Sequence, residues 1–159
     1  MPEFAGELSA PEGRFALVAA RFNSLVVDRL VVGAQLAFRQ HGVALDRIDV
    51  FQVPGALEIP LIARKAAETG RYVAVVCLGC VVRGDTAHFD VVVQQSAAGC
   101  SQAALATGVP VLNAILTTDT MEQALDRAGG KSGNKGAEAA LAAIETASLI
   151  RKMPAGGRP

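Results

Sequence analysis

Residues 73–90, VAVVCLGCVVRGDTAHFD, constrain the fold of this chain most strongly. Val73 to Cys80 is a short apolar run rich in β-branched side chains, which is typical of a strand buried on both faces of a sheet. The residues from Arg83 to Thr86 break this pattern, and a helical pattern begins near Asp90. A strand, a short glycine-containing loop and a helix in that order form half of a βαβ unit, so we predict an α/β fold.

The same alternation of strand and helix runs along the whole chain. Apolar runs predict strands over residues 15–20, 48–53, 73–80 and 109–116, and helical patterns occur over 24–41, 58–69, 90–107, 119–127 and 137–152. Right-handed crossovers then give a single-domain three-layer α/β/α sandwich with a four-stranded parallel sheet and flavodoxin-like topology. We expect this domain to span residues 14–153, between an N-terminal arm (1–13), which could pair with a neighbouring chain, and a disordered C-terminal tail (154–159).

The charge balance argues against nucleic acid or a membrane surface as a partner, because 15 basic and 15 acidic residues give a net charge of zero. Hydrophobic residues make up 51% of the 159 residues, but no apolar run approaches the roughly 18 to 20 residues that a membrane span needs. Residues 1–13 also lack the basic and apolar segments of a signal peptide. We therefore expect a cytoplasmic protein that hides its extra apolar surface in interfaces between subunits.

Two of the three cysteines, Cys77 and Cys80, have a C-x-x-C spacing, and the third is Cys100. A redox motif would place this spacing at a helix N-terminus, and a zinc site would need two further ligands. Because the pair lies in a predicted strand and only one more cysteine remains, we interpret all three as small buried hydrophobic residues.

Three predicted loops at the carboxyl ends of strands carry polar and aromatic residues, at 21–23, 55–58 and 83–88. Open α/β sheets bind ligands at this edge, and the unpaired amides that begin a helix suit a phosphate. His88 lies in the third loop, and a histidine titrates near neutral pH, so these residues suggest chemistry on a phosphorylated small molecule. The alternative is a capped helix start with a histidine on the surface.

Several candidate residues also have purely structural explanations. Phe22 could be a core residue or a lid over a planar ligand, and the residues alone favour the core. Glu58 and Arg127 lie in the first and last turns of predicted helices, where the helix dipole favours their charges without any function. The glycine-rich segment 129–136 carries two lysines and no acid, and it could be a flexible linker or a mobile cationic loop.

Taken together, these segments resemble the lumazine synthase family of riboflavin biosynthesis. The resemblance covers residues 15–149 in order and rests on five motifs: RFN (21–23), VPGALEIP (53–60), RGDTAHFD (83–90), LTTDTMEQALDRAG (116–129) and GNKG (133–136). It implies that the chain condenses 5-amino-6-(D-ribitylamino)uracil with 3,4-dihydroxy-2-butanone 4-phosphate to 6,7-dimethyl-8-ribityllumazine, releasing phosphate and water. The resemblance implies no cofactor and no metal.

The resemblance also implies roles for individual residues. His88 would shuttle protons, and the Arg127 side chain of an adjacent subunit would pair with the phosphate of the substrate. Phe22 would stack on the pyrimidine ring. The remaining substrate contacts that the resemblance implies are Asn23, Ala56, Leu57, Glu58, Cys80, Val81, Val82, Gly84, Asp85, Thr86, Asn113, Lys135 and Glu138.

One position departs from the family's pattern. Many members have an aromatic residue in the fourth strand where this chain has Asn113, so we expect Asn113 to hydrogen-bond the ring and Phe22 alone to stack on it. Members of the family form homopentamers with active sites between subunits, and some assemble twelve pentamers into a hollow 60-subunit shell. The short segment 129–136 favours the shell, and riboflavin synthase is a candidate partner.

Two other functions fit the same fold. A non-catalytic flavin- or lumazine-binding or shell-forming scaffold is one, but it would need neither His88 nor Arg127. A flavodoxin-like electron carrier would have a first loop rich in Ser, Thr and Gly. The first loop here, at residues 21–23, contains none of these three. The residues therefore favour the enzyme.

Overall fold

A computed structural model describes residues 1–9 and 12–156 of the chain. Four strands form one parallel sheet in the order β2-β1-β3-β4, and they are β1 (Arg14–Ala20), β2 (Ile48–Val53), β3 (Tyr72–Val82) and β4 (Val111–Thr118). The predicted four-stranded parallel sheet is therefore confirmed. β2 has the predicted bounds, whereas β3 and β4 each end two residues later than predicted.

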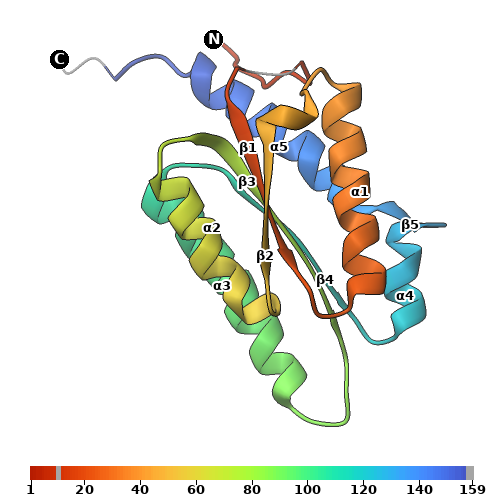
Figure 1. Cartoon of the computed structure of the whole chain (residues 1–159). Helices are drawn as coiled ribbons and strands as arrows, with labels where there is room; N and C mark the ends of the chain where they lie inside the picture. The colour runs from red at the N-terminus through yellow and green to blue at the C-terminus, as the bar shows by residue number, and fades with distance from the viewer. Residues whose placement is uncertain (10–11, 157–159) are drawn as a thin grey trace.

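Helices cover both faces of the sheet (Figure 1). α2 (Ile59–Glu68) and α3 (His88–Thr107) lie on one face, and α1 (Ser24–Gln40), α4 (Met121–Asp126) and α5 (Lys135–Lys152) lie on the other. The predicted three-layer α/β/α sandwich is confirmed. Within the part of the chain that the structure describes, no helix combines the length and the apolar character that crossing a membrane requires.

The two cores between the layers are built from alternate residues of the same strands. Phe15 and Leu17 of β1 pack on the side of α1 and α5, whereas Ala16 and Val18 pack on the side of α2. A strand imposes this period of two, and both of its faces are covered here. This explains why the strands read as continuous apolar runs in the sequence.

Small residues let α5 approach α1 closely. Gly136, in the first turn of α5, is buried, and a Cβ atom there would collide with the carbonyl oxygen of Leu30 in α1. Most of the other buried residues of α5 are alanines. These small residues therefore allow the close packing of α5 against α1.

The glycine-rich segment has a defined structure. β5 (Ala128–Gly130) and β6 (Gly133–Asn134) pair as a small antiparallel hairpin. Asn134 then caps α5, because its Oδ1 accepts a hydrogen bond from the amide of Ala137 at 3.1 Å. This segment is a hairpin and a helix cap, rather than the linker or loop that its composition predicted.

The starts of α2, α3, α4 and α5 each differ from the prediction by one or two residues, and α5 begins at Lys135 instead of residue 137. The capping box of α4 is formed by Thr120 and Gln123, so α4 begins at Met121, two residues after the predicted start. A 3₁₀ turn over Ala56–Glu58 precedes α2, which therefore begins at Ile59. α3 begins at His88, two residues before the predicted start.

The N-terminal residues lie along the end of α5. The amide of Glu7 donates to Ser148 Oγ at 3.1 Å, and the carboxylate of Glu7 lies 2.7 Å from Lys152 Nζ. Residues 10 and 11 of the predicted arm, and residues 157–159 of the predicted tail, lie outside the described residues. The described part of the arm therefore contacts its own chain.

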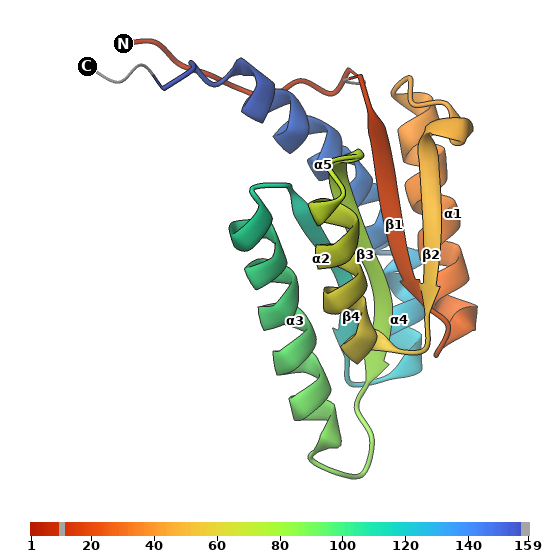
Figure 2. The same cartoon turned by 60° about the vertical axis from the view of Figure 1, so that its left-hand side comes forward.

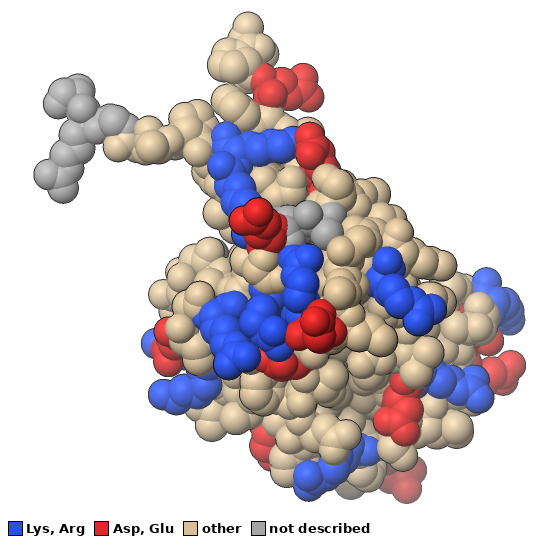
Figure 3. Space-filling model, turned by 45° about the horizontal axis from the view of Figure 1, so that its top comes forward, with Lys and Arg blue, Asp and Glu red and all other residues tan. Residues whose placement is uncertain are grey.

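Charged residues of both signs gather at the end of the sheet where the strands begin (Figure 3). Asp49 of β2 accepts hydrogen bonds from Arg14 Nη2 and from Tyr72 Oη, both at 2.6 Å, and Arg71 Nε lies 3.9 Å away. These four side chains, which we call the Asp49 network, join β1, β2 and the start of β3 at this end of the sheet.

Candidate functional site

The opposite end of the sheet carries a cavity of about 420 Å³. The loops that follow β1, β2 and β3 meet at this end, where the strands finish (Figure 2). The cavity is lined by Phe22, Pro54, Gly55, Ala56, Leu57, Glu58, Cys80, Val81, Val82, Gly84, Thr86, His88, Phe89 and Val92. The three loops singled out in the sequence therefore converge as predicted.

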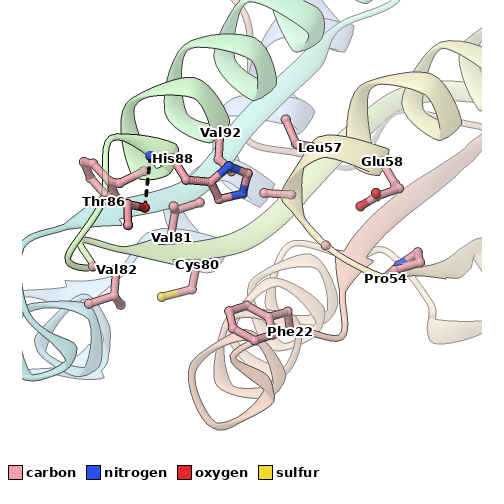
Figure 4. Close-up of a pocket in the computed structure, with 14 residues that line it drawn as sticks. Phe22, Pro54, Leu57, Glu58, Cys80, Val81, Val82, Thr86, His88 and Val92 are labelled. Carbon is pink, nitrogen blue, oxygen red and sulfur yellow. Dashed lines mark hydrogen bonds between the residues drawn. The ribbon is translucent and has the colours of Figure 1, made fainter.

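His88 is the first residue of α3, and its ring points into the cavity (Figure 4). Two residues earlier, Thr86 accepts a hydrogen bond from the His88 amide through Oγ1 at 3.3 Å. This turn from strand to helix fixes the backbone of His88 and leaves the imidazole exposed. The ring can therefore exchange protons with a ligand in the cavity.

Phe22 forms another wall of the cavity (Figure 4). Its side chain is 71% exposed, so the core position that the residues alone favoured is wrong. The backbone holds it in place, because the amides of Arg21 and Phe22 donate to the carbonyl oxygens of Val53 and Pro54 at 2.8 and 3.1 Å. An exposed aromatic ring on a fixed loop offers a face on which a planar ligand can stack.

Asn23 has a structural contact at the edge of the site. It is the one non-glycine residue with positive φ in the described part of the chain, at φ 62° and ψ 45°. Its Nδ2 donates to the carbonyl oxygen of Cys80 at 2.8 Å. The amide that the resemblance assigned to substrate binding thus ties the loop after β1 to β3 and does not line the cavity.

Glu58 reaches the cavity from the loop after β2. The 3₁₀ turn over residues 56–58 buries Ala56 and directs the Glu58 carboxylate towards the space that the His88 ring also faces (Figure 4). Gly55 leaves room for this carboxylate, because a Cβ atom there would lie 3.2 Å from Glu58 Oε2. An acid and a histidine from different loops therefore share one space.

All three cysteines are buried and free, as predicted. Cys80 borders the cavity, but burial raises the pKa of its thiol to about 11, so the thiol is protonated near neutral pH. Cys77 and Cys100 contact each other in the core beside α3, where the hydrogen bond that Cys77 donates to Cys100, together with burial, raises the pKa of Cys77, and the same hydrogen bond lowers the pKa of Cys100. The one cysteine that borders the cavity, Cys80, is therefore not an activated nucleophile.

Arg127 lies outside the cavity. It directly follows α4, on the face of the sheet opposite to α3 (Figure 1). Its Nη1 donates to the carbonyl oxygen of Gln123 at 3.0 Å. A single chain therefore does not bring Arg127 to His88.

Four other predicted residues also lie outside the cavity. Lys135 and Glu138 form an ion pair at 3.4 Å in the first turn of α5. Asn113 lies on the edge strand β4, and its Oδ1 accepts a hydrogen bond from the amide of Ile115 at 2.9 Å. Asp85 is exposed on the loop between β3 and α3. Within one chain, Asn113 is therefore not placed to contact a ring held by Phe22.

The cavity also contains residues that the prediction missed, namely Pro54, Gly55, Phe89 and Val92. Val92 follows His88 by four positions in α3, so helical spacing could have placed it on the same face. Pro54 and Gly55 belong to the quoted motif at 53–60 but were not named as contacts. Phe89 likewise belongs to the quoted motif at 83–90 but was not named as a contact.

The arrangement can hold a planar polar molecule beside a phosphorylated one. The Phe22 ring offers a stacking face, and the Glu58 carboxylate can accept hydrogen bonds. The loop from Gly84 to Thr86 and the start of α3 suit an anion, and His88 can transfer a proton between the two. Among the residues that the structure describes, no three His, Cys, Asp or Glu side chains gather as a metal ion would require.

The sequence matches the family model for 6,7-dimethyl-8-ribityllumazine synthase over residues 12–151. Three similar proteins carry this name. The one from Deinococcus radiodurans is 56% identical over 153 residues, which cover 96% of this chain and 99% of the relative. The one from Deinococcus deserti is 55% identical over 154 residues, covering 97% and 99%. The one from Chlorobium luteolum is 49% identical over 151 residues, covering 95% and 97%.

Proposed function

The chain belongs to the 6,7-dimethyl-8-ribityllumazine synthase family, and we propose that the cavity beside His88 is its active site. The protein is a transferase of riboflavin biosynthesis. It condenses 5-amino-6-(D-ribitylamino)uracil with 3,4-dihydroxy-2-butanone 4-phosphate and releases 6,7-dimethyl-8-ribityllumazine, phosphate and water. The observation that carries the proposed site is that Phe22, Glu58 and His88 face one cavity from three different loops.

The two substrates take different parts of this cavity. The uracil ring stacks on Phe22, and its ribityl hydroxyl groups donate hydrogen bonds to Glu58. Backbone groups around Ala56 and Val81 form hydrogen bonds with the edge of the ring. The phosphate of the second substrate lies at the loop from Gly84 to Thr86, where amides and the Thr86 hydroxyl donate to it. His88 then lies close to both reactants.

The reaction begins when the amine of the uracil attacks the ketone, so the orientation of two bound reactants contributes much of the rate. The resulting Schiff base loses phosphate by β-elimination, and a cation beside the departing anion stabilises it. His88 takes the proton released at carbon and returns it during ring closure and dehydration. This sequence of steps needs no nucleophilic side chain, which agrees with the buried and protonated thiol of Cys80.

The cation is Arg127 of a second copy of the chain. The position of Arg127 supports this assignment, because it follows α4, and α4 and α3 lie on opposite faces of the sheet. Lys135 and Glu138, on the same side as α4, would close the far side of that shared site.

Exposed apolar side chains support an assembly of several copies. They include Leu61 on α2 and Leu105 on α3, and on the opposite face Leu25 and Val32 on α1. Two different apolar surfaces suit head-to-tail contacts, which can close into a ring. These features agree with the homopentamer that the resemblance to the family implies. The 60-subunit shell, the association with riboflavin synthase and the cytoplasmic location stay predictions.

A direct test mixes the purified protein with both substrates and follows the lumazine product by absorbance and fluorescence. We expect product well above the uncatalysed background, and a loss of about a hundredfold or more in kcat for Arg127→Ala, because the departing phosphate loses its cation. Near-normal turnover of Arg127→Ala would contradict its role. Background rates from folded protein would instead favour a non-catalytic binding protein or scaffold on this fold.

Mixed assemblies test whether the site is shared between chains. When Arg127→Ala and His88→Ala subunits assemble at random, about a quarter of the shared sites contain both native residues. Co-expression should therefore restore activity to about a quarter of the native value. If mixed assemblies, confirmed by mass spectrometry, gain nothing over the separate variants, the two residues do not act together across an interface.

A further inference from the structure

We propose that Arg83 is a positioning residue that holds the loop of residues 84–88 and helix α4 in a fixed relation to each other. The inference rests on the proposed function, because it concerns that same site. Arg83 directly follows the last residue of β3 and is not among the side chains that line the cavity. Its guanidinium instead contacts the two segments on either side of it.

On one side, Arg83 fastens the loop that carries Thr86 and His88. The guanidinium covers the ring of Phe89, with 4.4 Å between Cζ and the ring centroid, and Nη1 lies 3.9 Å from Asp90 Oδ1. Phe89 and Asp90 directly follow His88 in the first turn of α3. Arg83 therefore contacts the far end of the loop that it begins, and both an aromatic face and a carboxylate attract a cation there.

On the other side, Arg83 contacts the segment that leads into α4. Its Nε donates to Asp119 Oδ1 at 2.7 Å, and its amide donates to the carbonyl oxygen of Thr118 at 2.9 Å. The amide of Asp119 donates to Gln123 Oε1 at 2.9 Å, and the carbonyl oxygen of Gln123 accepts the hydrogen bond from Arg127. A continuous set of contacts thus runs from Arg83 to the guanidinium of Arg127.

These contacts join parts of two different active sites. In the proposed assembly, the loop of residues 84–88 binds the phosphate in the chain's own site, whereas Arg127 serves the site of a neighbour. Arg83 and Asp119 are 52% and 65% exposed, so their ion pair contributes little to global stability. Its effect should appear in the kinetics, because a small misplacement of a substrate-binding group slows the reaction.

The test compares Arg83→Gln, Asp119→Asn and the double variant in the lumazine assay. We expect each single variant to raise KM for the butanone phosphate and to lower kcat, each by about fivefold. KM for the ribitylaminouracil and the thermal midpoint should not change. The double variant should lose no more than Arg83→Gln alone, because Asp119 acts through its contact with Arg83.

Arg64→Gln is the matched control. Arg64 is 54% exposed and its Nε lies 2.8 Å from Glu68 Oε1, so the pair closely resembles that of Arg83 with Asp119. It lies on α2, away from α4 and from the loop of residues 84–88. We expect this variant to leave kcat and both KM values unchanged.

Each other outcome overturns the inference in a distinct way. Additive losses in the double variant would mean that Arg83 acts on the substrate itself and not through Asp119. Native kinetics in Arg83→Gln would remove any role in the reaction, and a lower thermal midpoint would indicate a general structural role. A native protein that forms no lumazine would refute the proposed function. An active native protein together with unchanged kcat and KM in Arg83→Gln would refute only this inference.

Discussion

The two ends of the sheet use similar polar side chains in opposite ways. Where the strands begin, Asp49 is surrounded by Arg14, Tyr72 and Arg71, and hydrogen bonds from Arg14 and Tyr72 lower the pKa of its carboxyl group. Where the strands end, Glu58 and His88 face an open cavity. Side chains that satisfy one another hold strands together, whereas side chains left facing a cavity are available to a substrate.

The direction of the strands explains which end has which role. In a parallel sheet the helices begin at the carboxyl ends of the strands, so unpaired amides and partial positive charge gather there. The helices finish at the other end, where the strands begin. There the first residues of β1, β2 and β3 lie side by side, and the Asp49 network can link them.

The chain's two histidines offer the largest contrast between the ends. His88 faces the cavity, while His41 follows α1 at the opposite end, with Nδ1 2.8 Å from the carbonyl oxygen of Ala37. We expect His88→Ala to lower kcat by about ten- to a hundredfold, because proton transfer is lost while the orientation of the substrates remains. His41→Ala, measured in the same assay, should keep the native kcat and KM. Equal losses of kcat in the two variants would contradict the division of roles between the two ends of the sheet.

Much of the fold and part of the site could be predicted because local patterns encode them. Continuous apolar runs gave the strands, and the loops after them had to share one edge of a parallel sheet. Phe22 marks a limit of this reasoning. Hydrophobic character favours burial, but the exposed position of its ring depends on the loops around it, which the sequence does not place.

Other features have no local signal at all. Asp49 is 35 positions from Arg14 and 23 from Tyr72, and Arg83 is 36 positions from Asp119, so no periodicity reveals these contacts. Arg127 could be placed at the end of a helix from its sequence. That α4 carries it to the face opposite His88 follows only from the tertiary structure.

Tyr72→Phe tests whether the Asp49 network serves stability alone. Tyr72 is buried, and burial raises the pKa of its hydroxyl group, which therefore stays protonated and donates to Asp49. Removing this hydrogen bond should lower the free energy of unfolding by about 1 kcal/mol, while kcat and both KM values keep their native values. Denaturant unfolding at a fixed protein concentration measures the loss. A kinetic defect at native stability would contradict the division between the two ends.

The smallest expected effect is in the pH dependence of stability. Hydrogen bonds from Arg14 and then Tyr72 hold the pKa of Asp49 below its ordinary value of 3.8 in the folded protein. The unfolded chain therefore binds this proton first as the pH falls, and the contribution of Asp49 is fully present above the ordinary pKa. It is lost as the pH falls through the lowered folded pKa.

The stability difference between the native protein and Asp49→Asn should accordingly stay constant from pH 7 to about pH 5 and shrink below about pH 4. Tyr72→Phe should complete its own acid loss at a higher pH than the native protein and lose less in total, because it removes one of the two hydrogen bonds that lower the folded pKa of Asp49. Thermal midpoints of the native protein and both variants, measured from pH 7 to pH 3, test these expectations. Parallel curves for the native protein and Asp49→Asn down to pH 3 would show that the carboxylate is not held by its partners. The two ends of the sheet would then differ only in shape and not in how their charges are satisfied.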